Sequence, residues 1–291
     1  MMYTLENELC RVAVAAHGAE LHSFIRKDLD NLEYIWPADA AYWNRHAPVL
    51  FPIVGRLPHD AYQHQGQPYT LGQHGFARDR EFTLLHQTSA ELTLELRAVE
   101  QSRRQYPFEF ALRISYRLAG AMLTIGWEVE NPGTKELLFS IGAHPAFRCP
   151  LLPEESFEEY EFVFDHPVTL QRHLLEGGLL NGQTAPVLEQ QDTLPLSYEL
   201  FAEDALVFKH FDFTHLTLRS RRSGRSVRVR FDGFPYLGLW TKGPGAPFVC
   251  IEPWQGIASS TTSSPELADK EGILSLQPGQ QFLTSHSITV A

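Results

Sequence analysis

Three titratable side chains in this sequence share a local context that could support proton transfer. His144, Glu252 and His74 each lie close to a glycine or a proline, where a strand-like stretch ends. Strand ends in a β-sandwich gather around one mouth, so residues that are far apart in the sequence can meet there. A carboxylate and imidazoles that converge in this way could take up and deliver protons near neutral pH.

The settings of His144 and Glu252 suggest how each side chain is held. His144 follows the apolar run 137–141 and precedes Pro145, which cannot donate to a sheet ladder, so we expect a stiff backbone there. Glu252 directly follows the apolar run 248–251. Burial would raise the pKa of this carboxyl and suit it to a general base. A glutamate paired with a nearby arginine is the structural alternative.

His74 lies between Gly72 and Gly75, which allow positive φ angles and close approach of another group. Metal binding is a rival interpretation of the trio, because two histidines and a glutamate can hold zinc or iron. The sequence has no H-x-H and no H-E-x-x-H motif, so we favour proton transfer and expect no metal. Cys149 and Cys250, which lie near the motifs, are expected to be small buried hydrophobic residues rather than nucleophiles.

Aromatic residues near these motifs could serve either the core or a sugar site. The four residues concerned are Phe76, Phe147, Trp240 and Trp254. Most of them are expected in the core, although a sugar site would use one or two, because the apolar face of a sugar lies well on a flat ring.

The elements that carry these residues are predicted to be short β-strands. Short apolar and alternating runs are separated by turn-rich segments, which is typical of antiparallel sandwiches and barrels. About fifteen to twenty such strands fit one large all-β domain over residues 1–291. We expect only short helical segments, at 39–44, 99–105 and 264–270, and long loops with short strands over the segment 170–194.

Composition narrows the class of protein. The 291 residues are 43% hydrophobic and 12% aromatic, which indicates a packed globular chain. A net charge of -11 argues against general affinity for nucleic acid or an anionic membrane. The three cysteines have no metal-like spacing and indicate a reducing compartment. The N-terminal residues 1–11 have no apolar signal-peptide region, so we expect a cytoplasmic protein.

Four motifs resemble the aldose 1-epimerase (galactose mutarotase-like) superfamily, and most closely its LacX-like branch. They are Phe51–Arg56 (FPIVGR), His74–Arg78 (HGFAR), Gly142–Phe147 (GAHPAF) and Glu252–Trp254 (EPW), in the family's order. The resemblance covers nearly the whole chain. It implies a large antiparallel β-supersandwich with few short helices, and a reaction that needs no metal and no cofactor.

The resemblance also implies roles for individual residues. Glu252 would be the base that takes the proton from the anomeric hydroxyl of an aldose. His144 would be the acid that protonates the ring oxygen, so that the ring opens and closes again on the other face. The residues expected to bind the substrate are His74, Arg56, Arg78, Asp204 and Phe147.

The motifs depart from the pattern of the galactose enzymes. Those enzymes usually have Asn-His before an aromatic residue and a Glu before Thr-Gln, whereas this chain has Ala-His-Pro at 143–145 and Glu-Pro-Trp at 252–254. Relatives that act on hexose 6-phosphates also have an HGFAR stretch. Arg56 and Arg78 could therefore bind a phosphate, for which a guanidinium fork is suited. An ion pair between Arg78 and Asp79 is the structural alternative.

The sequence therefore predicts a mutarotase that interconverts the α and β anomers of an aldose. Its partner would be a small-molecule sugar or sugar phosphate. Two alternatives are a hexose-6-phosphate mutarotase and a non-catalytic carbohydrate-binding domain on the same fold. The identity of the sugar and the oligomeric state stay open at this stage.

Overall fold

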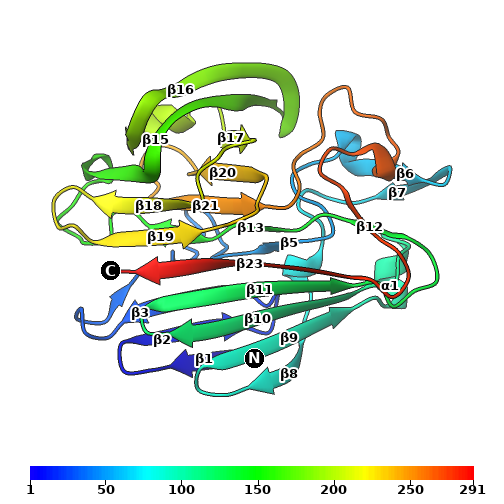
Figure 1. The fold of residues 1–291 in the computed structure, drawn as a ribbon, viewed down its shortest axis with the longest axis horizontal. Coiled ribbons are helices and arrows are strands. Elements are labelled where there is room, and N and C mark those ends of the chain that lie inside the picture. Colours follow the sequence, from blue (N-terminus) through cyan, green and yellow to red (C-terminus); the bar gives the residue numbers. More distant parts are fainter.

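The computed structural model describes residues 1–291, which form antiparallel β-sheets joined by short helical turns (Figure 1). The N-terminal sheet has the order β1 (Met2–Glu6), β2 (Cys10–Ala15), β3 (Leu21–Arg26), β4 (Leu32–Glu33). Two small sheets pair β6 (Ala61–His64) with β7 (Gln67–Thr70), and β12 (Leu137–Phe139) with β22 (Leu274–Leu276).

A 15-stranded sheet forms the rest of the fold. Its path is β5 (Val49–Leu50), β13 (Gly142–Ala143), β21 (Phe248–Trp254), β20 (Tyr236–Trp240), β17 (Leu206–Lys209), β15 (Tyr160–Glu176), β18 (His215–Ser220), β19 (Ser226–Arg230), β23 (Gln281–Val290), β11 (Met122–Glu130), β10 (Ala111–Ala119), β9 (Glu91–Arg97), β8 (Thr83–Gln87). Off this path, β14 (Ala146–Arg148) pairs with β21 and β16 (Leu179–Pro195) pairs with β15.

The helical content is confined to short turns. The elements are α1 (Glu100–Arg103) and the 3-10 turns η1 (Pro58–Asp60), η2 (Ala77–Asp79), η3 (Phe157–Glu159), η4 (Tyr198–Phe201), η5 (Leu267–Asp269). The prediction of an all-β fold with few short helices is confirmed, and two of these turns fall in the helical segments expected from the sequence. No helix is long and apolar enough to cross a membrane.

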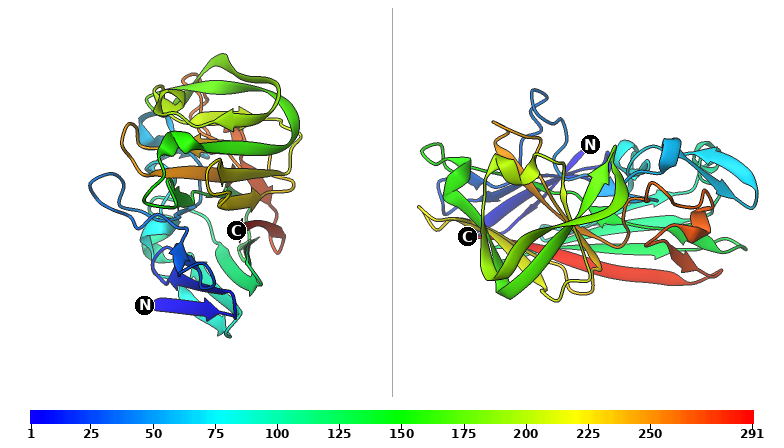
Figure 2. Two further views of the ribbon diagram at one scale, coloured as in Figure 1. Left: turned by 90° about the vertical axis from the view of Figure 1, so that its left-hand side faces the viewer. Right: turned by 90° about the horizontal axis from the view of Figure 1, so that it is seen from above.

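The expected long loops over 170–194 are wrong. The chain instead forms the long hairpin β15–β16, which curves over β17 and β20 (Figures 1 and 2). Register shifts between Val163 and Val168 and at three further places interrupt the alternation of buried and exposed residues. Because bulges break the period of two, the strand pattern is weak in the sequence.

The core explains why these segments pair as they do. In β10 and β11 every second residue is buried, as expected for strands with one face on the core. The main cluster of 68 buried apolar residues draws on both the N-terminal sheet, through Val12 and Phe24, and the large sheet, through Leu112 and Ile114. Full burial of each such side chain contributes about 1.5–3 kcal/mol.

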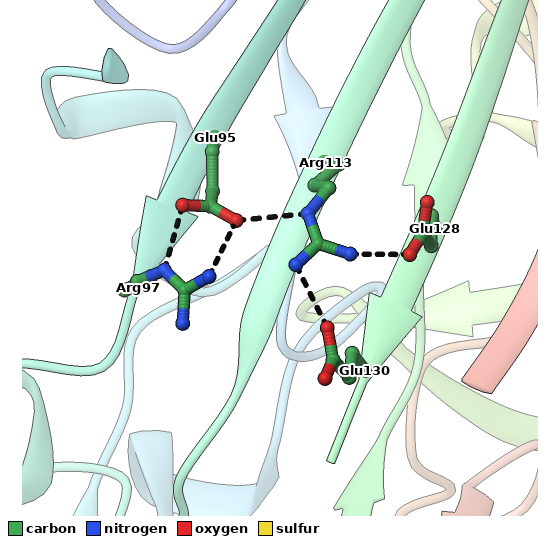
Figure 3. A network of polar contacts seen from close by, with 5 residues as sticks. All are labelled: Glu95, Arg97, Arg113, Glu128 and Glu130. Atoms are coloured by element: carbon green, nitrogen blue, oxygen red, sulfur yellow. Dashed lines mark hydrogen bonds and ion pairs between the residues drawn. The ribbon is translucent and has the colours of Figure 1, made fainter. Parts of the chain in front are cut away.

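The opposite face of β9, β10 and β11 carries a network of ion pairs between arginines and glutamates. Arg113 lies at the centre and donates to Glu95 at 2.8 Å, to Glu130 at 2.8 Å and to Glu128 (Figure 3). Arg97 forms a bidentate pair with the same Glu95, at 2.6 and 3.0 Å. The Glu95 side chain is only 9% exposed, so its charge depends on these partners.

We predict that Arg113→Met lowers the free energy of unfolding by about 1–3 kcal/mol, because it removes the less exposed of the two arginines that pair with the buried Glu95. Arg97→Met is the matched control. Its guanidinium is 56% exposed, so we expect a loss below about 1 kcal/mol. Urea unfolding of both variants measures the difference, and equal losses would contradict a central role for Arg113.

Candidate active site

A cavity of about 270 Å³ opens between the ends of β17, β20 and β21 and the loops that face them. Five of the seven side chains expected from the sequence line it: His74, Arg78, His144, Asp204 and Glu252. Its volume suits a small ligand of the size of a monosaccharide rather than a polymer.

Strand register brings His144 and Glu252 together. Gly142 pairs with Trp254, and Ala146 pairs with Cys250, in one antiparallel register. His144 lies midway between Gly142 and Ala146, and Glu252 lies midway between their partners, so the two residues fall opposite each other. Its Nε2 lies 3.2 Å from Oε2 of Glu252, and both side chains are almost completely buried.

Two glycines make room for the large ring beside this pair. A Cβ on Gly238 would lie 2.4 Å from the indole of Trp254, and a Cβ on Gly142 would lie 2.6 Å from the same ring. Gly238 is also the cross-strand partner of Glu252. The glycine that opens the GAHPAF motif is thus required for the packing of Trp254, which forms part of the cavity wall.

Burial shifts the pKa values of Glu252 and His144 in opposite directions. Desolvation, and then the carboxylate of Asp204, raise the pKa of Glu252 well above its usual value. Desolvation, and then the positive charge of Arg78, lower the pKa of His144 to about 3. Because both shifts disfavour charge, the pair holds one proton between its two groups over a wide range of pH.

His74 is fixed by the backbone of the FPIVGR motif. The ring Nδ1 of His74 accepts a hydrogen bond from the backbone N–H of Gly55 at 3.1 Å, and the backbone N–H of His74 donates to the carbonyl of Gly55 at 2.8 Å. With Nδ1 as an acceptor, the proton of the neutral ring must lie on Nε2. Burial, and then His144, hold the pKa of His74 well below its usual value. The ring is therefore a neutral donor, with its centre 5.7 Å from that of His144.

Arg78 and Asp204 add charge to the cavity wall. Arg78 donates from Nη2 to the carbonyl of Gln73 at 2.6 Å, while its buried Nε has no hydrogen-bond partner in the protein. Burial, and then Arg45, lower the pKa of Arg78 to about 10. Asp204 lies in the turn before β17 with a positive φ of 78° and accepts a hydrogen bond from the N–H of Ala205.

The structure does not place Arg56 and Phe147 in the cavity wall. Arg56 forms a bidentate pair with Asp60, at 2.9 and 3.0 Å, and also donates to the carbonyl of Gly177. Phe147 is completely buried in the main core, where β14 pairs with β21. The Phe147 ring therefore cannot contact a ligand in the cavity, and the Arg56 guanidinium is already paired with Asp60.

Sequence reasoning missed several residues that line the cavity. Trp43 comes from the irregular loop before β5 and stacks on His144, with ring centres 4.9 Å apart. Trp240 meets the same imidazole edge-on at 5.7 Å. Gln73 and Lys242 also line the cavity. Trp240 had been expected mainly in the core, whereas Trp43 lies in a segment with no periodic pattern that could signal a role.

In the structure, the residues that could hold a metal in the cavity are not the three that the sequence suggested. The potential ligands that lie within 4.8 Å of one another are His144, Cys250 and Glu252, and His74 is not among them. Nδ1 of His74 is already used by Gly55. Burial raises the pKa of the Cys250 thiol well above its usual value, so the thiolate that a metal needs is disfavoured there.

Comparison with known proteins agrees with this geometry. The family model "Aldose 1-epimerase" matches residues 1–288 of the chain. The chain belongs to the aldose 1-epimerase family. It is thus an isomerase of the aldose 1-epimerase class, and its substrate is a sugar.

The similar proteins include members of the LacX-like branch. The chromosomal protein LacX of Lactococcus lactis is 38% identical over 299 residues, which cover 100% of this chain and 99% of LacX. A galactose mutarotase related enzyme from Lactobacillus acidophilus is 35% identical, with a TM-score of 0.96 and coverage of 100% and 97%. A galactose mutarotase-like protein from Lactobacillus casei is 29% identical, with a TM-score of 0.93 and full coverage of both chains.

We predict that Gly238→Ala destabilises this aldose 1-epimerase by about 1–3 kcal/mol, because the added Cβ would overlap the ring of Trp254. Gly72→Ala is the matched control. No atom lies within 4 Å of its Cβ position, so we expect a change within about 0.5 kcal/mol. Chemical denaturation compares the two, and a Gly238→Ala protein as stable as the control would contradict this packing.

Proposed function

We propose that this chain is a mutarotase that interconverts the α and β anomers of an aldose, with Glu252 and His144 as its acid–base pair. The observation that carries the proposal is the 3.2 Å contact between Nε2 of His144 and Oε2 of Glu252 in the wall of a sugar-sized cavity. Ring opening needs one proton removed and one delivered a few ångströms apart, and this pair offers both groups.

The proposed reaction begins with the proton of the pair on His144. The Glu252 carboxylate takes the proton from the anomeric hydroxyl while the imidazolium gives its proton to the ring oxygen. The bond between C1 and the ring oxygen breaks, which leaves an open-chain aldehyde. After rotation about the C1–C2 bond, the former ring oxygen attacks the other face of C1. His144 then recovers its proton from that oxygen, and Glu252 returns its proton to the carbonyl oxygen.

The charge state of the pair fits this cycle. Burial favours the uncharged form, with the proton on Glu252, and the short contact allows the proton to reach His144. The carboxylate–imidazolium form is therefore higher in energy and more reactive than two ordinary charged groups in water. Trp43, stacked on the imidazole, would stabilise its protonated form through a cation–π interaction.

His74 and Asp204 are proposed to orient the sugar. The Nε2–H of neutral His74 can donate to a sugar oxygen near the imidazole of His144. The carboxylate of Asp204 can accept hydrogen bonds from sugar hydroxyls at the cavity wall. These contacts would hold the anomeric carbon within reach of the acid–base pair.

A hexose 6-phosphate is the second candidate substrate. Two cationic side chains, Arg78 and Lys242, line the cavity, and the buried Nε of Arg78 makes no hydrogen bond in the protein, since the nearest carboxylate oxygen, Oδ2 of Asp79, lies 3.9 Å away. An anionic substituent on the sugar would satisfy that donor and both charges. Comparison of glucose, galactose and glucose 6-phosphate as substrates distinguishes a neutral from a phosphorylated aldose.

We predict that Glu252→Gln slows anomer exchange by about 10²–10⁴-fold, because the amide keeps the shape of the side chain but cannot take a proton. Polarimetry or NMR of freshly dissolved α-aldose measures the rate above the spontaneous reaction. Glu189→Gln, at an exposed position on β16, is the matched control and should exchange anomers at the wild-type rate. Sugar binding without any acceleration by the wild-type protein would indicate a carbohydrate-binding domain instead.

A second substitution tests the assigned proton of His74. In His74→Asn the side-chain oxygen can still accept the hydrogen bond from Gly55, and asparagine tolerates the φ of 66° at this position. We expect near wild-type stability and a loss of about tenfold or more in kcat/KM, because the donor on Nε2 is gone. Activity at the wild-type level in a folded His74→Asn protein would show that this donor is not used.

A further inference from the structure

A second group of potential metal ligands lies away from the cavity. Glu20 immediately precedes β3, His22 lies on β3, and His46 lies in the loop that leads to β5. Their ligand atoms all lie within 4.8 Å of one another, and none of the three residues lines the cavity. A carboxylate with two imidazoles is a common ligand set for zinc and related ions.

Glu20 is held in an orientation that leaves one oxygen available. Its Oε1 accepts hydrogen bonds from the backbone N–H groups of His46 and Ala47, both at 2.8 Å. Its Oε2 lies 3.4 Å from Nε2 of His22. Two ligands on a tetrahedral zinc ion are about 3.4 Å apart, given metal–ligand bonds of about 2.1 Å. Hydrogen bonds that fix a ligating carboxylate in this way are typical supports of metal sites.

The two imidazoles lie side by side next to this carboxylate. The rings of His22 and His46 stack at 3.8 Å, an arrangement that two imidazolium ions would disfavour.

We propose that Glu20, His22 and His46 bind one divalent transition-metal ion, with zinc as the best fit and water in the remaining position. The side chain of His22 is 26% exposed, so an ion can enter from solvent and the ring can turn out of the stack to reach it. The ion would tie β3 to the loop that carries Trp43, the residue that stacks on His144. The proposal does not depend on the sugar reaction.

Isothermal titration of the full chain with zinc chloride, after removal of metals with a chelator, tests this site. We expect one zinc ion per chain in the wild type, and binding weaker by at least about tenfold in both His22→Ala and His46→Ala. His17→Ala is the matched control, because His17 also pairs with a glutamate, Glu81 at 3.2 Å, but has no second imidazole. It should bind zinc as the wild type does.

Two further measurements keep the outcome decisive. Circular dichroism before the titration shows whether each variant is folded, and zinc should raise the melting temperature of the wild type but not of His22→Ala. Absence of stoichiometric binding, or unchanged affinity in both histidine variants, would overturn the proposal. Loss of binding in Cys250→Ser with retention in His22→Ala would place the ion at the His144–Glu252 pair instead and would also overturn it.

Discussion

The contact between His144 and Glu252 is the interaction on which the rest of the site depends. Charges are costly to bury, so in this almost completely buried pair the favoured form is the uncharged one, with a single proton on Glu252. The antiparallel register of β13 and β14 against β21 forces the two side chains to face each other. The proton transfer that we propose for this pair therefore rests on how the strands pair.

Other features of the fold serve to keep that pair dry and oriented. Trp43 and Trp240 enclose the imidazole, and Trp254 fills the space that Gly142 and Gly238 leave beside it. The main chain of Gly55 sets the tautomer of His74, so the proton donor next to the pair is fixed before a sugar arrives. Rigid backbone contacts of this kind provide the preorganisation that acid–base catalysis requires.

Much of the site could be predicted from the sequence, because motifs at the ends of strands identify residues that can meet in one cavity. His74, His144 and Glu252 were found in this way. Arg56 lies outside the cavity wall, where its guanidinium pairs with Asp60, only four residues away. Phe147 was misplaced because the sequence does not show which face of a strand buried on both sides meets the cavity. Trp43 and the bulged hairpin β15–β16 escaped prediction, since neither segment keeps a regular period.

Whether the buried His144 ring becomes charged can be measured directly. The ¹⁵N shifts of the His144 imidazole, assigned by their loss in His144→Asn, report its protonation from about pH 8 down to about pH 4. The account predicts that this ring does not become doubly protonated in that range, in keeping with a pKa of about 3. A full titration step near the ordinary histidine value of about 6.5 would contradict it, because His144 and Glu252 would then act as independent charges.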